Sequence, residues 1–353
     1  MPDHSISGAV STGICRCPVC SAPLPADLAL PHPCFDRPIL NADGVVDLAS
    51  EDHYWNQIPR ETMPELCAKA ASDGCRAALK TFLKPVAGTA TFQYAWDERR
   101  ADWFPVCGLP DEPVIIDIGA GWGAVTTGLA RLGGHVFALD SNIETLKFQT
   151  IRAKENGLAN ITCMHVDPLE LAPLPFEDGV ADLVVMNGLL EWIGAAVEDG
   201  DPGELQRAAL REAWRVLKPG GTLYVGIESR FGFSFWRGAE DHRGTRFTSL
   251  LPRRLASRVT RRKGLGDYRT YTHSHRGLRK MLRAAGFQSA RFYEPYPTYR
   301  MAGRMVPLDD AGVLRRSVAA TGISRKHAWA LIAASWLGIH RNFVDSYSVV
   351  AQK

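Results

Sequence analysis

The sequence lacks long apolar runs and any large excess of charge of one sign. Its longest nearly apolar run, Trp329 to Ile339, is far shorter than the ~20 residues that cross a bilayer, so no membrane span is predicted. Met1 to Ile14 has neither the basic start nor the apolar core of a secretory signal, and we therefore expect a cytoplasmic, reducing location. A net charge of +3 does not indicate nucleic-acid binding by the whole chain, and 46% hydrophobic residues exclude disorder.

The eight cysteines are unevenly distributed, with four of them near the start of the chain. Cys17 and Cys20 have the two-residue gap that lets both sulfurs reach one tetrahedral Zn²⁺, and Cys34 can be a third ligand. His32 and Cys15 are the available fourth ligands. We predict a structural zinc site of Cys17, Cys20, His32 and Cys34, with the relic of a lost site as the alternative.

The chain divides into three predicted parts: a Cys-rich module over residues 1–50, a helical lead-in over 51–110, and an α/β domain over 111–353. In the lead-in, one helix is expected from Glu65 to Leu83, ended by Lys84-Pro85. In the third part, strands alternate with helices of ~10–15 residues, which predicts a parallel, doubly wound sheet. The expected strands are Val114–Ile118, His135–Leu139, Ile161–Val166, Leu183–Met186, Leu223–Ile227, Gln288–Tyr293 and Tyr347–Ala351; the expected helices are Ala124–Leu132, Ile143–Glu155, Leu205–Leu217, Arg276–Ala285 and His327–Leu337.

A basic insertion interrupts this alternation from Phe231 to Thr272. It contains ten Lys or Arg and three Asp or Glu, a net charge of +7. Because it follows the end of an expected strand, where ligands of such sheets bind, we interpret it as a substrate cap. A solvated basic surface is the alternative.

A glycine turn follows the first strand of the α/β domain, in the stretch Asp117-Ile118-Gly119-Ala120-Gly121-Trp122-Gly123. Glycines permit a tight turn and close approach of the backbone to a ligand. With Ala124, the turn also satisfies the looser dinucleotide pattern, but a pyrophosphate favours positive potential, whereas Asp117 adds a carboxylate. This charge favours a cationic ligand, and S-adenosylmethionine carries an ammonium and a sulfonium and no phosphate.

Two further aspartates come at the ends of the next two strands. Asp140 lies where a carboxylate can accept hydrogen bonds from both ribose hydroxyls. Asp167 lies where a carboxylate can accept a hydrogen bond from an adenine amino group. A single aspartate at a strand end is often only a helix cap or turn residue. Together with Asp117, however, these acids are expected at one edge of the sheet, which indicates a cofactor site.

Four stretches resemble the successive motifs of class I S-adenosylmethionine-dependent methyltransferases: Val114–Thr126 (VIIDIGAGWGAVT), Phe137–Asp140, Leu174–Glu191 (LPFEDGVADLVVMNGLLE) and Leu210–Val225 (LREAWRVLKPGGTLYV). The resemblance covers roughly Tyr94 to Lys353. It implies a Rossmann-like, seven-stranded sheet whose last strand is antiparallel. The N-terminal cysteines resemble the zinc-ribbon-like heads of some methyltransferases, although Arg37 stands where their second cysteine pair would end.

The resemblance also implies the cofactor residues. The methionine end would be held by Asp117, Gly119, Ala120 and Gly121, the ribose by Asp140 with Ser141, and the adenine by Asp167 with Pro168; Asn187 would form the wall beside the methyl group. Tyr94 belongs to an aromatic segment similar to one that precedes the core in many methyltransferases acting on sugars, and it could lie over the cofactor or pack in the core.

The acceptor is expected to be a hydroxyl. After the fourth strand stands Met186-Asn187-Gly188-Leu189, which is neither the Asn/Asp-Pro-Pro-aromatic signature of exocyclic-amine methylation nor a Pro-Cys pair for attack on a C5 carbon. A hydroxyl acceptor must lose a proton. Candidate groups at or beyond the fifth strand are Glu228, Arg230, Asp241, His242 and His273. Of these, His242 is the favoured base, because its ordinary pKa is near 6.5 and Asp241 adjoins it. Glu191 is also counted among the catalytic candidates, although it could instead cap the loop after the fourth strand. A solvated loop histidine is the alternative for His242.

The segments Glu228–Asp241, Tyr268–Thr272 and Phe292–Tyr299 resemble a subset of bacterial methyltransferases associated with surface-glycan assembly. We therefore predict O-methylation of a saccharide or other small hydroxylated acceptor, including acceptors that bear phosphate, because arginines bind diphosphates and aromatic rings stack on sugars. Two alternatives stay open: methylation of ribosomal or transfer RNA, with the basic insertion on phosphate, and a non-catalytic partner protein with this fold.

Overall fold

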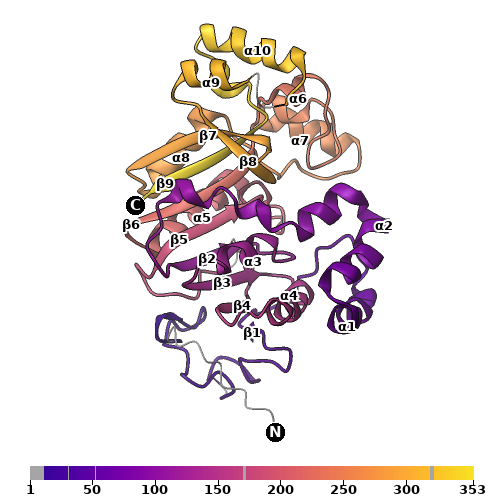
Figure 1. The fold of residues 1–353 in the computed structure, drawn as a ribbon, viewed down its shortest axis with the longest axis vertical. Coiled ribbons are helices and arrows are strands. Elements are labelled where there is room, and N and C mark those ends of the chain that lie inside the picture. Colours follow the sequence, from indigo (N-terminus) through magenta and orange to yellow (C-terminus); the bar gives the residue numbers. More distant parts are fainter. Residues whose placement is uncertain (1–11, 31, 52, 170–171, 319–321) are drawn as a thin grey trace. The chain divides into compact units, whose positions relative to one another are not determined.

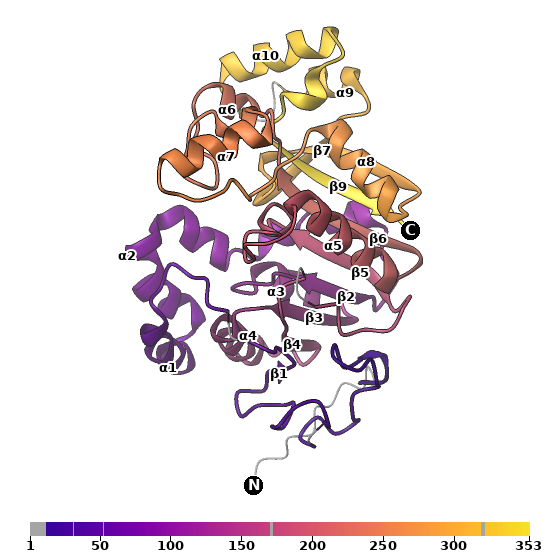
Figure 2. The same ribbon diagram turned by 180° about the vertical axis from the view of Figure 1, so that it is seen from behind.

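The computed structural model describes residues 12–30, 32–51, 53–169, 172–318 and 322–353. The chain forms two compact units, of which the first comprises Met1–Val185 with Val216–Lys218 and the second comprises Met186–Arg215 with Pro219–Lys353 (Figures 1 and 2). In the described ranges, none of the helices combines the length and the apolar character that a bilayer crossing requires.

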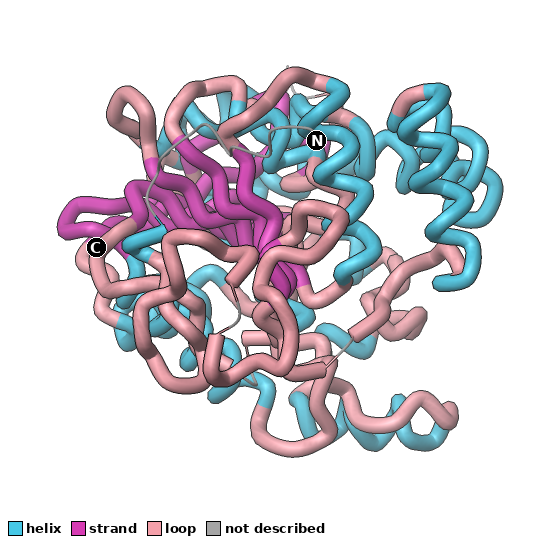
Figure 3. Tube along the Cα trace, turned by 90° about the horizontal axis from the view of Figure 1, so that it is seen from below, coloured by secondary structure: helices cyan, strands magenta, loops and turns pink. Residues whose placement is uncertain are grey.

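The first unit contains a parallel sheet with the strand order β1-β4-β3-β2-β5 (Figure 3, magenta). Its central strands are runs of buried apolar residues, as in parallel sheets covered on both faces. Both predicted central strands are therefore confirmed. The strands are β1 (Val46–Asp47), β2 (Val114–Ile118), β3 (His135–Asp140), β4 (Ile161–His165) and β5 (Ala181–Asn187), the last of which runs on into the second unit.

The helices of this unit are α1 (Met63–Asp73), α2 (Cys75–Trp96), α3 (Ala124–Ala130) and α4 (Ile143–Glu155). Helix α4 has the predicted bounds, because its ends are determined locally. At its start the Asn142 side chain accepts a hydrogen bond from the Glu144 N–H, and at its end Asn156 and Gly157 terminate it. The alternation of strands and helices confirms the Rossmann-like α/β fold.

The prediction of a single helix from Glu65 to Leu83, ended by Lys84-Pro85, is wrong: the segment forms two helices, and the second continues past Pro85. Gly74, with φ of 93°, separates α1 from α2, and α2 continues past Pro85 to a kink at Gly88, where φ is 79°. Glycine adopts these positive φ values without the steric cost that other residues pay. Helix α2 tolerates Pro85 because its buried residues, including Leu79 and Leu83, pack in a tertiary core.

The second unit contains an antiparallel sheet with the strand order β6-β9-β7-β8. Its strands are β6 (Leu217–Glu228, of which the first two residues belong to the first unit), β7 (Ser289–Thr298), β8 (Met301–Pro307) and β9 (Ser346–Gln352). Its helices are α5 (Pro202–Val216), α6 (Phe233–Trp236), α7 (Arg253–Arg262), α8 (His275–Ala285), α9 (Ala311–Ser317) and α10 (Arg325–Trp336). The predicted antiparallel direction of the last strand is confirmed by both of its neighbours.

The strand count differs from the prediction, because the described residues form nine strands rather than seven. The two additional strands are β1 and β8. Strand β1 has only two residues, too few for any periodicity. Strand β8 contains two exposed residues in succession, Gly303 and Arg304, so its sequence lacks the alternation that marks a half-buried strand.

Strand β7 contains a buried acid, Glu294, whose side chain is almost inaccessible. Burial raises the pKa of Glu294 to about 8. Between the ordinary value of 4.5 and about pH 8, the folded protein therefore holds a proton that the unfolded chain has lost. The free energy of unfolding should fall across this window as pH rises, and level off above it.

Glu294→Gln should remove this contribution, so that urea midpoints decline less between about pH 5 and pH 8 than in the wild type. The exposed Glu240→Gln is the matched control and should leave the slope unchanged. An unchanged slope in the Glu294 variant would show that Glu294 is ionised in the folded state.

Candidate functional site

The glycine turn after β2 has the conformation that its sequence predicts. Gly119, Gly121 and Gly123 all have positive φ, of 71°, 54° and 79°, a region that other residues rarely adopt. The side chain of Gln149 on α4 donates to the Gly121 carbonyl at 2.7 Å and occupies the space where a Cβ on Gly123 would lie. The turn therefore depends on glycine for its conformation, and it is held by the side chain of Gln149, 28 residues further along the chain.

Asp117 lies on β2, one residue before its end, and is almost completely buried. Its carboxylate accepts a hydrogen bond from the Thr126 hydroxyl at 2.7 Å. Burial raises the pKa of Asp117 to about 6, despite the opposing effects of that hydrogen bond and of the Arg100 charge. A cation bound beside Asp117 would favour its ionised form, which suits the ammonium of the predicted ligand.

Asp140 ends β3, the strand that pairs with β2. One carboxylate oxygen accepts from the Gly121 N–H at 2.7 Å, and the other accepts from the Asn142 N–H at 2.9 Å. Burial raises the pKa of Asp140, and these backbone donors oppose the shift. The carboxylate is thus oriented by the glycine turn itself. The next residue, Ser141, presents its carbonyl oxygen to the His165 ring at 3.2 Å.

Asp167 follows the end of β4, and its neighbour is Pro168. Its carboxylate accepts from the backbone N–H groups of Ser50 and Glu51, at 3.0 Å and 3.3 Å. Asp167 therefore binds the segment that leads out of the N-terminal module. Strands β4, β3 and β2 are parallel neighbours, so Asp167, Asp140 and Asp117 lie toward the same edge of the sheet, as predicted.

Tyr94 lies near the end of α2, and the guanidinium of Arg100 packs over its ring at 3.5 Å from the centroid. Arg100 is buried and also donates to the Tyr94 carbonyl. The charge of Arg100 lowers the pKa of Asp117, although burial outweighs this effect.

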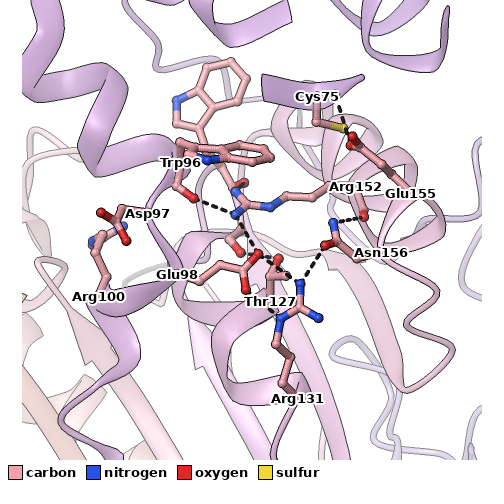
Figure 4. A network of polar contacts seen from close by, with 12 residues as sticks. Cys75, Trp96, Asp97, Glu98, Arg100, Thr127, Arg131, Arg152, Glu155 and Asn156 are labelled. Carbon is pink, nitrogen blue, oxygen red and sulfur yellow. Dashed lines mark hydrogen bonds and ion pairs between the residues drawn. The ribbon is translucent and has the colours of Figure 1, made fainter. Parts of the chain in front are cut away.

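A buried arginine connects the same helix to the turn (Figure 4). Arg152 on α4 donates to the carbonyls of Ala95 and Trp96 at the end of α2, at 3.0 Å and 2.7 Å. It also donates to the carbonyl of Trp122 in the glycine turn, at 3.2 Å. Its charge is balanced by Glu98, at 3.6 Å. Sequence reasoning missed Arg152, because a lone arginine on an amphipathic helix normally indicates a solvated surface.

The N-terminal module brings the four predicted metal ligands together. The ligand atoms of Cys17, Cys20, His32 and Cys34 all lie within 4.8 Å of one another, and His32 Nε2 is 3.9 Å from the Cys20 sulfur. Cys15, the alternative fourth ligand, is instead buried, and its backbone forms an isolated β-bridge with Phe176. This donor set, three thiols and one imidazole, suits tetrahedral Zn²⁺ and leaves no open position for chemistry.

A cluster of polar side chains in the second unit surrounds His242. Glu191 is completely buried, and its Oε1 is 3.7 Å from His242 Nε2. On the other side of the ring, Glu228 Oε2 at the end of β6 is 3.4 Å from His242 Nδ1. The indole of Trp192 meets the imidazole edge to face at 4.9 Å. The predicted base is therefore held between two carboxylates and is not a solvated loop histidine.

Two further residues complete this cluster. The Tyr299 hydroxyl donates to Glu191 Oε1 at 3.3 Å, and Arg300 lies 3.6 Å from Glu228. Half of the Arg300 side chain is exposed, so the cluster meets solvent on the Glu228 and Arg300 side. No pattern in the sequence indicated a role for Arg300. Tyr299 was predicted only as an aromatic that stacks on a sugar.

The pKa shifts in this cluster follow from burial. Burial, followed by the charge of Glu228, raises the pKa of Glu191 to about 8, so Glu191 is mostly protonated at neutral pH. Burial lowers the pKa of His242, although Glu228 opposes the shift. His242 is therefore a neutral imidazole at neutral pH, the form that can accept a proton.

The other predicted groups have structural contacts. The Asp241 carboxylate does not bind His242: it accepts from the Arg243 N–H and from the N–H and hydroxyl of Thr245, which closes a turn. His273 is paired with Gln206 at 2.7 Å, and burial lowers its pKa to about 3. Arg230 donates to the carbonyls of Ser249 and Leu251.

Asn187 ends β5, and both polar atoms of its buried side chain have no hydrogen-bond partner among the described residues. The same is true of His242 Nε2 and Glu191 Oε2. Buried polar atoms are normally paired, and a group of unpaired ones indicates a place for a ligand.

Gly226 on β6 makes room for the Asn187 side chain. A Cβ on Gly226 would lie 2.3 Å from Asn187 Oδ1 and 3.0 Å from a ring carbon of Tyr299. Gly226→Ala should therefore lower the free energy of unfolding by about 1–3 kcal/mol, measured by urea denaturation. Gly303→Ala on β8 is the matched control, because its nearest atom is at 3.8 Å. Equal stability of the two variants would contradict this packing.

Comparison with known proteins shows which part of the chain resembles methyltransferases. Residues 116–225 match a family model described as a methyltransferase domain. A tRNA (guanine-N(7)-)-methyltransferase of Lactococcus lactis is 28% identical over 152 residues, which are 42% of this chain and 65% of that protein. A ubiquinone/menaquinone biosynthesis C-methyltransferase of Vibrio vulnificus is 25% identical over 182 residues, which are 51% of this chain and 65% of that protein.

Solved structures include a phosphoethanolamine N-methyltransferase of Haemonchus contortus with S-adenosyl-L-methionine, with 16% identity and a TM-score of 0.42 over 77% of this chain and 59% of that one. This chain spans 65% of the length of the two curated relatives described above. These relatives act on different acceptors, so the likeness extends to the type of domain and not to one substrate.

Proposed function

We propose that this chain, which contains a class I S-adenosylmethionine-dependent methyltransferase domain, transfers a methyl group to a hydroxyl of a small acceptor such as a saccharide. The observation that carries the proposal is His242, neutral and buried, between the carboxyl groups of Glu191 and Glu228. A hydroxyl must lose its proton as it is methylated, and an oriented neutral imidazole can accept that proton.

S-adenosylmethionine supplies an electrophilic methyl group whose leaving group is already activated by the sulfonium. For its binding we assign Asp117, Gly119, Ala120 and Gly121 to the methionine end, Asp140 and Ser141 to the ribose, and Asp167 and Pro168 to the adenine. Asn187 would form the wall beside the methyl group, and Tyr94 would cover the cofactor. The raised pKa of Asp117 and the unpaired side chain of Asn187 support these assignments.

His242, Glu228 and Glu191 would have different roles in the transfer. Glu228 would accept a hydrogen bond from His242 Nδ1 and keep the proton there, so that Nε2 is free to take the acceptor proton. Glu191, which is mostly protonated, would donate a hydrogen bond to the acceptor and so position it. Arg300 and Glu228 lie on the exposed side, where a polar acceptor would enter. Asp241 would act only through the turn that carries His242.

RNA methylation is the second candidate, favoured by the tRNA methyltransferase relative and by the basic insertion. Several arginines of that insertion are occupied by protein contacts. Arg253 packs over the Tyr271 ring at 4.1 Å, and Arg269 donates to the carbonyls of Gly194, Asp199 and Gly200. These two arginines are engaged by the protein, so only part of the insertion's positive charge is available to a phosphate.

Transfer of tritiated methyl from S-adenosylmethionine would test the acceptor class. Purified protein should be incubated in parallel with total RNA and with a glycan and metabolite extract of the source cells. We expect label in a hydroxylated small-molecule or saccharide fraction. Label in RNA alone would overturn the O-methylation proposal and select the RNA candidate.

We further propose that the N-terminal module holds one structural Zn²⁺ through Cys17, Cys20, His32 and Cys34. Mass-spectrometric metal analysis should find one zinc per chain, and Cys20→Ser or Cys34→Ser should remove it. The matched control is Cys67→Ser, a half-buried cysteine of α1 that should keep the metal. The same trace zinc in all four proteins would indicate a degenerate module.

A further inference from the structure

The second unit exposes large apolar side chains on one group of helices and loops. Trp329 and Trp336 on α10 are 72% and 73% exposed, and Leu337 just after them is 73% exposed. In the described part of this unit, the exposed large apolar residues all lie between positions 236 and 339: Trp236, Phe247, Leu255, Leu265, Trp329, Trp336, Leu337 and Ile339. Scattered single apolar residues are ordinary on a protein surface, but Trp329, Trp336, Leu337 and Ile339 lie together on and just after α10, and such a group indicates an interaction surface.

Helix α10 presents its tryptophans in a fixed direction. Trp329 and Trp336 are seven residues apart, so they lie on the same side of the helix. The opposite side, which includes Leu331 and Ala334, is buried in the unit. Ser324 caps the start of the helix by accepting from the His327 N–H. The exposed tryptophans are therefore held outward by the packing of the rest of the helix.

Helices α6 and α7 lie near α10, at the same end of the second unit in both views (Figures 1 and 2). Phe233 on α6 stacks on His327 of α10 at 4.7 Å, and Trp236 stacks on Phe343 at 6.5 Å. Trp236 is itself half exposed. The Phe233–His327 stack lies on the packed side of α10, opposite its exposed tryptophans, so α6 supports α10 from that side.

Cations surround these apolar side chains. Exposed arginines of α7 include Arg254, Arg258 and Arg261, next to the exposed Leu255. Residues 311–343 contain five Lys or Arg and no Asp or Glu, and they are flanked by Asp309, Asp310 and Asp345. One of these cations, Arg315, lies over the Trp336 ring at 4.1 Å from the centroid. We call the exposed side of α6, α7 and α10 the apolar-basic face.

We propose that the apolar-basic face binds the surface of a bilayer that contains anionic phospholipid. Tryptophan and leucine side chains enter the boundary between headgroups and acyl chains, and surrounding arginines bind lipid phosphates. RNA would also attract arginines and could stack on the tryptophans, but it offers nothing to the aliphatic Leu255, Leu337 and Ile339. This inference is independent of the acceptor that the protein methylates.

Vesicle co-sedimentation tests the proposal with two lipid compositions, phosphatidylcholine alone and phosphatidylcholine mixed with phosphatidylglycerol. The wild-type protein should sediment with the mixed vesicles and much less with phosphatidylcholine alone. The double variant Trp329→Gln/Trp336→Gln should bind at least about tenfold more weakly. The double variant Arg254→Gln/Arg258→Gln should lose about fivefold in affinity for each arginine, and added salt should reduce wild-type binding in the same way.

Matched controls separate this surface from general stickiness or misfolding. Trp55→Gln removes a tryptophan of the first unit that is 69% exposed, and it should bind vesicles as the wild type does. Thermal unfolding of each variant checks that it is folded, which is expected because the replaced side chains are exposed. Vesicles with brominated acyl chains should quench tryptophan fluorescence in the wild type and less in the double variant.

Three outcomes would overturn the proposal. The first is no sedimentation with either vesicle. The second is equal sedimentation of the wild type and the folded tryptophan variant. The third is tight binding to total tRNA, measured by fluorescence anisotropy, without binding to vesicles, which would assign the face to nucleic acid.

Discussion

Replacing Asp140 with alanine is expected to weaken S-adenosylmethionine binding by about a hundredfold, measured by isothermal titration calorimetry. Asp140 ends β3, and backbone N–H groups of Gly121 and Asn142 orient its two carboxylate oxygens. Each oxygen keeps a lone pair that can accept a hydrogen bond from a ribose hydroxyl. Hydrogen bonds to a charged acceptor are stronger than those between neutral groups. The alanine variant loses these acceptors and also leaves the Gly121 N–H without its partner.

Asp140→Asn should bind more weakly than the wild type but better than the alanine variant, because an amide keeps one acceptor without the charge. Asp111→Ala, an exposed acid shortly before β2, is the control and should bind normally. Wild-type affinity in the Asp140→Ala protein would contradict the cofactor assignment, and with it the methyl-transfer proposal.

Replacing His242 with alanine is expected to lower kcat for methyl transfer by about 10²–10⁴-fold while S-adenosylmethionine affinity stays unchanged. His242 is the neutral base between Glu191 and Glu228, and Glu191 cannot take its place because it is mostly protonated. The measurement is the rate of tritium transfer into whichever fraction the wild type labels. Arg246→Ala, an exposed residue of the same insertion, is the control.

The pH profile distinguishes a catalytic histidine from a structural one. Because burial lowers the pKa of His242, the acid limb of kcat should lie below about pH 6.5. The charge of Glu228 raises that pKa, so Glu228→Gln should move the acid limb to still lower pH. A profile that Glu228→Gln leaves in place, or near-normal turnover of His242→Ala, would show that another group removes the proton.

The elements predicted best were those determined by neighbours in the sequence. Strand β2 and helix α4 have their predicted bounds, because a short apolar run, a capping asparagine and a terminal Asn-Gly pair act within a few residues. The helix predicted across Gly74 was wrong because a glycine inside an apolar pattern can be accommodated or can end a helix, and tertiary packing decides which. Strand β8 was missed because it pairs with β7 through its backbone and lacks an apolar alternation.

The sequence by itself determined the glycine turn, the acids at the strand ends and the three clustered cysteines, because these features depend on local spacing and on the fixed direction of parallel strands. The tertiary structure alone decided which distant groups meet. It selected His32 over Cys15 as the fourth possible metal ligand, turned Asp241 away from His242, and placed Glu191 and Glu228 on either side of that ring. Glu191, Glu228 and His242 are far apart along the chain, so no periodic pattern in the sequence connects them. Their pKa shifts depend on burial, and burial exists only when the surrounding helices and strands have packed.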